Sequence, residues 1–126
     1  MQVTFLLIFT LENFEAMANE NCIRTFSGIE DALYVIGGKW RLRIIIALFD
    51  GARRFNEIQR AVTGISAKVL TDELRHLELN GFLKRGGLEA PVVTTYSLTD
   101  YSQTLRSVVH ALHDWGRAHR ENIKRQ

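Results

Sequence analysis

Residues 64–85 read GISAKVLTDELRHLELNGFLKR, and this stretch decides how the rest of the chain can fold. Three leucines recur at helical spacing and form one apolar face: Leu70, Leu74 and Leu77. The other face is polar and holds Lys68, Thr71, Asp72, Arg75 and His76. Ser66 is a favourable N-cap and Gly81 a favourable stop, so we predict a helix over residues 66–80. Its polar face is either solvated surface or a surface that reads a partner.

A second short helix precedes this stretch. In RRFNEIQRAVTG, residues 53–64, Phe55, Ile58 and Val62 fall on one face and a glycine ends the pattern. The two helices meet through TGIS, residues 63–66, which is typical of a helix-turn-helix. The second helix of such a pair has the right form to enter a DNA major groove.

The two segments further upstream are also predicted to be helical. SGIEDALYVIGG, residues 27–38, has Ser27 and Glu30 at capping-box spacing and ends at paired glycines, which indicates a short helix. KWRLRIIIALFDG, residues 39–51, is too apolar for a surface element. We expect it to be the central buried helix, with Trp40 as a large core anchor.

The chain changes period after Gly81. Phe82 and Leu83 begin a short strand, and residues 94–99 are rich in β-forming side chains, with Pro91 in the loop between them. A hairpin directly after a helix-turn-helix is a wing. We therefore predict a mainly α fold with a small β-hairpin wing, that is, a winged helix-turn-helix of the α+β class.

One long helix starting near Asp100 is predicted for the tail. It carries an apolar stripe made of Leu105, Val108, Val109, Leu112 and Trp115. A stripe of this length on a terminal helix has to be covered, most simply by a second copy of the chain. We predict that these five residues form a homodimer interface.

Length and composition fit one domain. The chain has 126 residues, of which 46% are hydrophobic, so it should fold. The apolar run from Val3 to Phe9 lacks a basic start and is too short to span a bilayer, so neither a signal peptide nor a membrane partner is expected. Residues 1–26 are then an extension or dimerisation arm. They either add a strand or helix that covers a dimer surface, or include an extension, residues 1–16, upstream of a natural start at Met17. Residues 27–126 form the winged domain with its carboxy-terminal dimerisation helix.

The positive charge is concentrated in the middle of the chain. The net charge is +2, yet residues 1–38 hold one basic and five acidic residues, whereas residues 39–86 hold ten basic and five acidic residues. A basic centre is a suitable electrostatic footprint for phosphates. The single cysteine, Cys22, excludes an internal disulfide and suits a reducing compartment, so we expect a cytoplasmic protein.

Five segments carry a resemblance to a known family: ALYVIGGKW, FNEI, GISAKVLTDELRHLELNGFLKR, YSLT and HDWGRAH. In this order and spacing they resemble the HxlR family of winged helix-turn-helix transcriptional regulators, within the broader MarR-like group. The resemblance implies a homodimeric bacterial DNA-binding regulator, paired through its amino-terminal and carboxy-terminal helices. Many members carry a cysteine just before the first helix, where this chain has Ser27. Cys22 lies upstream of that position and is kept as a candidate redox sensor.

The candidate DNA-contacting residues fall into two groups. The helix face away from the leucines includes Ala67, Lys68, Thr71 and Arg75, and the two in the first turns, Lys68 and Thr71, are best placed to read base edges. Phosphates would meet the amides at the helix start near Ser66 and the basic residues that bracket the helix. These bracketing residues are Arg53, Arg54, Lys84 and Arg85. The alternative for both groups is an ordinary solvated surface.

Other chemistry has less support. We find no Ser/His/Asp context, phosphate-cradling glycine loop or paired carboxylates, so we predict no enzyme and no cofactor. His110, His113 and His119 with Asp114 suggest a metal site, but packing at the dimer surface explains them more simply, and no metal is expected. We predict a sequence-specific double-stranded DNA-binding regulator, a dimeric repressor on a pseudo-palindromic operator, with an unknown effector. The alternative is a winged-helix protein-interaction module whose basic face binds an acidic partner.

Overall fold

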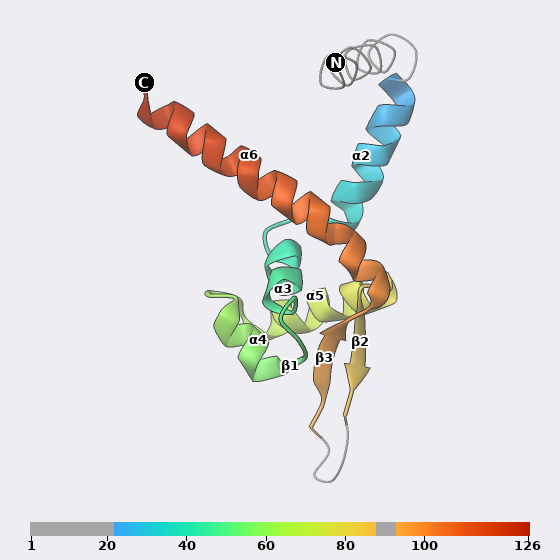
Figure 1. Ribbon diagram of the computed structural model, residues 1–126. Coiled ribbons are helices and arrows are strands. Elements are labelled where there is room, and N and C mark those ends of the chain that lie inside the picture. Colours follow the sequence, from blue (N-terminus) through green and yellow to red (C-terminus); the bar gives the residue numbers. More distant parts are fainter. Residues whose placement is uncertain (1–21, 88–92) are drawn as a thin grey trace, which may run out of the picture. The chain divides into compact units, whose positions relative to one another are not determined.

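The computed structural model describes residues 22–87 and 93–126. The chain divides into two compact units, Met1–Gly37 and Gly38–Gln126. The described part of the first unit is helix α2, Cys22–Ile36. The second unit holds α3 Arg41–Ala47, β1 Arg53–Arg54, α4 Phe55–Ala61, α5 Ala67–Leu79, β2 Leu83–Gly86, β3 Thr95–Leu98, the 3-10 helix η1 Asp100–Leu105 and α6 Arg106–Lys124 (Figure 1). The expectations for residues 1–21 and for the hairpin loop around Pro91 lie outside the described residues.

Helix α2 is longer than the sequence predicted. It begins at Cys22, so Ser27 lies inside the helix and is not its N-cap. The predicted start was wrong because no glycine or proline stops the helix upstream, and an interior serine costs only about 0.5 kcal/mol relative to alanine. The predicted end is confirmed. The amide of Gly37 donates to the carbonyl oxygen of Leu33 at 2.8 Å, and a Cβ at Gly37 would lie 2.2 Å from that same oxygen.

The core of the second unit is formed by α3, α4 and α5. Aliphatic side chains from these helices and the turn after α3 are buried there: Ile44, Ile45, Leu48, Ile58, Leu70, Leu74 and Leu77. Burying each such side chain contributes about 1.5–3 kcal/mol to folding. The prediction of α3 as the central buried helix is confirmed.

Trp40 is not the core anchor that the sequence suggested. It is only half-buried and stands just before the first turn of α3. The ring lies 4.6 Å from the Lys39 ammonium and 5.7 Å from the Arg43 guanidinium. The ring sits at the helix entrance, where it contacts these cations and lies beside Gly64 of the turn between α4 and α5.

The wing belongs to a three-stranded antiparallel sheet in the order β1-β3-β2. The predicted hairpin of β2 and β3 is confirmed, with Leu83 opposite Leu98. Strand β1, Arg53–Arg54, pairs with β3 and was wrongly predicted as helix. The helix starts later because the Glu57 carboxylate accepts a hydrogen bond from the Arg54 amide at 2.8 Å, which makes Arg54 the residue before the first turn.

The tail begins with a 3-10 turn, not with the α-helix predicted from Asp100. Ser102 is fully buried, and its hydroxyl donates to the carbonyl of Phe82 at 2.5 Å. The Thr99 amide donates to the same carbonyl at 3.1 Å, and the Thr99 hydroxyl donates to the Gly81 carbonyl at 2.6 Å. These bonds hold the start of the tail to the end of α5, so α6 begins only at Arg106.

Ser102→Ala is expected to lower the free energy of unfolding by about 1 kcal/mol, because it removes the buried hydroxyl and its hydrogen bond, while the Phe82 carbonyl still accepts from the Thr99 amide. Urea unfolding followed by circular dichroism measures this. Ser107→Ala is the control, since Ser107 is exposed and its hydroxyl bond to the Thr104 carbonyl is long, at 3.5 Å. Equal losses in the two variants would contradict the structural role of Ser102.

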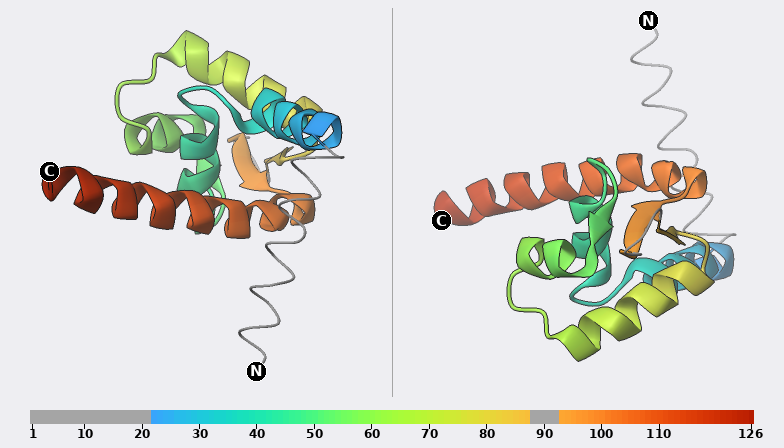
Figure 2. Two further views of the ribbon diagram at one scale, coloured as in Figure 1. Left: turned by 90° about the horizontal axis from the view of Figure 1, so that it is seen from above. Right: turned by 90° about the horizontal axis from the view of Figure 1, so that it is seen from below.

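Helices α5 and α6 lie on opposite sides of α3 and β3 in the second unit (Figure 2). The solvent-facing sides of α5 and α6 are therefore separate surfaces, and each can meet a different partner. No helix among the described residues is both long and apolar enough to cross a membrane.

Candidate nucleic-acid interface

The turn between α4 and α5 is held by buried side chains and by hydrogen bonds to its backbone. Val62 and Ile65 are buried, and the Ile65 amide donates to the Val62 carbonyl at 3.3 Å. The side-chain amide of Gln59 donates to the Ile65 carbonyl at 3.3 Å. Gly64 between them has φ +91°, a left-handed conformation that favours glycine. Helix α5 therefore leaves the turn in a defined direction.

Helix α5 has the predicted amphipathic form. The Ser66 hydroxyl accepts a hydrogen bond from the Val69 amide at 3.2 Å, so the predicted N-cap is confirmed. Leu70, Leu74 and Leu77 are buried, at 0%, 2% and 0% exposure. The exposed face holds Ala67, Lys68, Thr71, Asp72 and Arg75. The helix ends at Leu79, close to the predicted end, and Gly81 follows it with φ +80°, a left-handed conformation that favours glycine.

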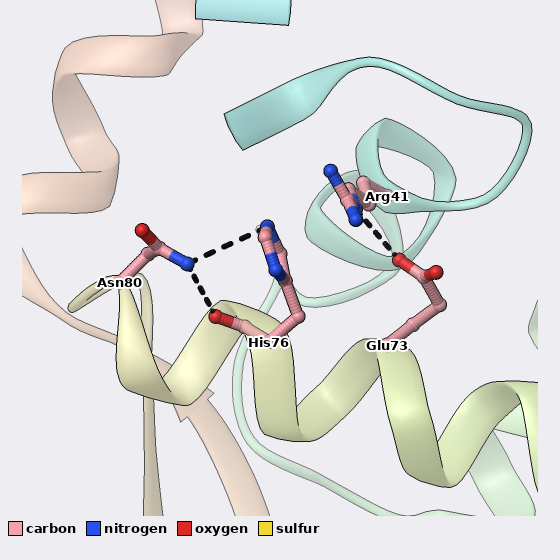
Figure 3. Close-up of polar contacts among 4 residues, drawn as sticks. All are labelled: Arg41, Glu73, His76 and Asn80. Carbon is pink, nitrogen blue, oxygen red and sulfur yellow. Dashed lines mark hydrogen bonds and ion pairs between the residues drawn. The ribbon is translucent and has the colours of Figure 1, made fainter. Parts of the chain in front are cut away.

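His76 does not lie on this exposed face, so the prediction was wrong for that residue. It is half-buried, and the Asn80 side-chain amide lies 3.4 Å from its Nε2 and donates to its carbonyl at 2.8 Å (Figure 3). Positions 73, 76 and 80 share a strip of helix that borders the leucines, because residues three and four apart are neighbours. All three residues of this strip are half-buried.

An ion pair joins α5 to α3. The Nε of Arg41 donates to a carboxylate oxygen of Glu73 at 2.8 Å, and the two side chains are only 23% and 22% exposed (Figure 3). A charge-assisted hydrogen bond between two partly buried groups is stronger than a surface pair. The pair therefore adds a polar clamp to the apolar contacts that hold α5.

Glu73→Gln is expected to lower the free energy of unfolding by about 1 kcal/mol, because the Arg41 guanidinium loses its anionic partner and keeps at most a hydrogen bond to a neutral amide oxygen. A double-mutant cycle with Arg41→Met isolates the contribution of the pair. Glu121→Gln on α6 is the control, since its pair with Lys124 is exposed and 3.7 Å long. A coupling energy near zero in the cycle would show that the pair does not clamp α5.

The exposed face of α5 offers a continuous polar stripe. Lys68, Thr71 and Arg75 follow one another at spacings of three and four and are all exposed. The Thr71 hydroxyl donates to the Ala67 carbonyl at 2.8 Å, so Thr71 can present to a partner only its oxygen as an acceptor and its methyl group. The stripe can thus offer a cation, an acceptor with a methyl group, and a guanidinium in one row.

The bracketing basic residues differ in how available they are. Arg53 is half-buried, and its Nε donates to the Ala47 carbonyl at 2.7 Å, so part of its guanidinium is used inside the protein. Arg54 is 65% exposed and lies 4.0 Å from Glu57. Lys84 is exposed on β2. Its neighbour Arg85 is paired with Glu78 of α5, a contact between a helix and a strand that no sequence periodicity indicates.

One face of α6 is apolar. Val108, Leu112 and Trp115 are 38%, 51% and 68% exposed, and Val109 is half-buried. Leu105 is different, because it lies in η1 and is buried in the core of its own chain. A groove of about 1090 Å³ between α3 and α6 continues this face and is lined by Leu42, Arg43, Ile46, Phe49, Arg106, Val109, His110, Leu112 and His113.

Two aromatic contacts border this face. The Trp115 ring stacks on the His119 ring at 5.0 Å between centroids, so His119 packs against the apolar stripe. The Arg106 guanidinium lies 4.4 Å from the centre of the Phe49 ring and donates to the Phe49 carbonyl at 3.3 Å. Cys22 is the first residue of α2, and its side chain lies outside the described residues.

Comparison with known proteins agrees with this arrangement. A family model for the HxlR-like helix-turn-helix matches residues 35–124. The uncharacterised HTH-type transcriptional regulator YdeP of Bacillus subtilis is 36% identical over 96 residues, which cover 75% of each chain. The HTH-type transcriptional regulator YodB of the same bacterium is 35% identical over 100 residues, covering 79% of this chain and 86% of YodB.

A solved structure has the same fold. The redox regulator HypR in its reduced form aligns with a TM-score of 0.71 at 35% identity, covering 79% of this chain and 99% of the HypR chain. The predicted winged helix-turn-helix fold is confirmed by this likeness and by the helices and antiparallel sheet described above. The relatives are transcriptional regulators by name, and such proteins are not enzymes. The chain belongs to the HxlR-like helix-turn-helix family.

Proposed function

We propose that the protein is a sequence-specific double-stranded DNA-binding transcriptional regulator that places α5 in a major groove. One observation carries this proposal: α5 is held by buried leucines and by Glu73, while Lys68, Thr71 and Arg75 project from it as an exposed polar stripe. A helix anchored on one side and polar on the other can enter a groove without losing its own packing. The names of the relatives support the same function.

The two groups of polar residues have different roles in this proposal. Lys68, Thr71 and Arg75 read base edges, since a cation or guanidinium can donate to guanine and a threonine methyl can contact thymine. Arg54, Lys84 and the amides at the start of α5 near Ser66 meet phosphates and fix the position of the protein on the duplex. Arg53 contributes less because its Nε is bonded within the protein.

The protein acts as a homodimer in this proposal. The exposed apolar residues of α6, Val108, Leu112 and Trp115, together with Val109, meet the same residues of a second copy. A two-fold dimer presents two α5 helices to a pseudo-palindromic operator with half-sites about one or two helical turns apart. Binding represses transcription in the cytoplasm, and an effector acts by changing the relative orientation of the two reading helices.

The test is binding of the purified protein to its own upstream intergenic DNA and to random duplex, over a salt series and with and without reductant. The expected result is preferential binding to the intergenic fragment, with an affinity that falls steeply as salt rises. A response to reductant would give Cys22 a sensing role. Equal binding to both duplexes would contradict the proposal and favour a protein-interaction module.

A further inference from the structure

A carboxylate lies among the basic residues of the proposed DNA-facing surface. Glu78 is in the last turn of α5, and both of its oxygens lie 3.1 Å from the Nε of Arg85 on β2. The Glu78 side chain is 34% exposed and the Arg85 side chain 60% exposed. The pair is therefore open to solvent and to any anion that approaches the wing.

The pair stands at the junction of the reading helix and the wing. Arg85 is opposite Tyr96 in the sheet, and both line a hollow of about 480 Å³ together with Thr71, Leu74, Arg75, Glu78 and Leu79. Two candidate DNA-contacting residues of α5, Thr71 and Arg75, thus share one concave surface with Arg85. An anion in this hollow would be surrounded by the guanidinium groups of Arg75 and Arg85 and by the carboxylate of Glu78.

Electrostatics favours an exchange of partners at this point. A partly exposed ion pair is weak, so a competing anion can replace one of its members. A backbone phosphate that approaches the hollow is attracted by Arg75 and Arg85, and it competes with Glu78 for the Arg85 guanidinium. Arg85 has Glu78 as its partner when DNA is absent. Binding of a phosphate to Arg85 therefore has to break this ion pair, which lowers the net gain in binding free energy.

We propose that Glu78 restrains Arg85 and thereby sets the affinity of the wing for backbone phosphates. The ligand class is the phosphodiester backbone of DNA, which must displace Glu78 from Arg85. This inference rests on the proposed function. It assigns to Glu78 a positioning role that involves no base: the residue weakens binding to every duplex by the same factor and so limits the time spent on random DNA.

The experiment compares wild type with Glu78→Gln, Arg85→Ala and the double variant on intergenic duplex, on random duplex and on a heparin column, where sulfates stand in for phosphates. Glu78→Gln is expected to bind both duplexes about two- to fivefold more tightly, to steepen the salt dependence and to leave heparin at higher salt. The double variant is expected to behave like Arg85→Ala, because Glu78 acts through Arg85. Glu121→Gln removes the same charge from α6 and is expected to bind as wild type does.

Two results would overturn the inference. If the double variant keeps the gain of Glu78→Gln, the carboxylate repels phosphate directly and does not act through Arg85. If Glu78→Gln weakens binding, the pair fixes the wing for DNA instead of restraining Arg85. Failure of the proposed function is a separate outcome, seen when wild type does not distinguish the intergenic duplex from random duplex. The heparin and random-duplex measurements still test Glu78 in that case, because the exchange needs only a polyanion.

Discussion

Replacing both Lys68 and Arg75 by alanine is expected to lower the affinity for the operator by about a hundredfold or more. Each contact to a base edge contributes about 1–3 kcal/mol, and every 1.4 kcal/mol is about a factor of ten. Both side chains are exposed on α5, so the free energy of unfolding should be almost unchanged. Fluorescence anisotropy on the operator and on random duplex, with urea unfolding of the same samples, measures both quantities.

The control for the Lys68 and Arg75 double variant removes the same amount of positive charge, but from α6 instead of α5. Arg117 and Lys124 are exposed on α6 and lie seven residues apart, as Lys68 and Arg75 do on α5. Alanine at both control positions removes two positive charges from the protein, so it reports the general electrostatic loss. The proposed reading face is wrong if the α5 variant and the α6 variant bind the operator equally well.

Leu112→Asp is expected to convert the proposed homodimer into monomers. Leu112 is half-exposed on α6, so the substitution changes little in the isolated chain. In a dimer, however, it would place an unpaired carboxylate in an apolar contact, at a cost of several kcal/mol, or about a hundredfold or more in the dimerisation constant. The operator affinity should fall together with the mass, because a monomer engages a single half-site.

Sedimentation equilibrium gives the mass, and anisotropy gives the operator affinity at the same protein concentration. Ser107→Asp is the matched variant, since Ser107 is exposed on α6 but stands outside the row of Val108, Leu112 and Trp115. It should remain a dimer and bind the operator as wild type does. A dimeric Leu112→Asp protein would exclude this face of α6 as the interface.

The sequence by itself determined the parts whose signals are local. The helix of the opening stretch is recognisable because a cap at Ser66 and leucines three and four residues apart are short-range features. The strands β2 and β3 and the long terminal helix follow from the same kind of pattern. The family resemblance rests on these segments, so the fold and the candidate reading face were predictable.

The same local reasoning failed where a pattern had two meanings. Ser27 and Glu30 are at capping-box spacing, yet α2 runs past Ser27 because an interior serine is tolerated. Leu105 belongs to the apolar periodicity of the tail, yet it is buried in its own chain within η1. A periodic pattern tells which residues are apolar together, but it does not tell whether their own chain or a second copy covers them.

Only the tertiary structure decided the contacts between distant segments. Arg41 and Glu73 are 32 positions apart, and β1 pairs with a strand more than 40 residues further along the chain. Arg85 meets Glu78 because Gly81 reverses the chain between α5 and β2. Such pairs depend on loop closure and on the packing of whole elements, which no local spacing encodes. The sequence therefore determined which side chains are candidates for reading DNA, and the folded chain determined which of these charges are already paired within the protein.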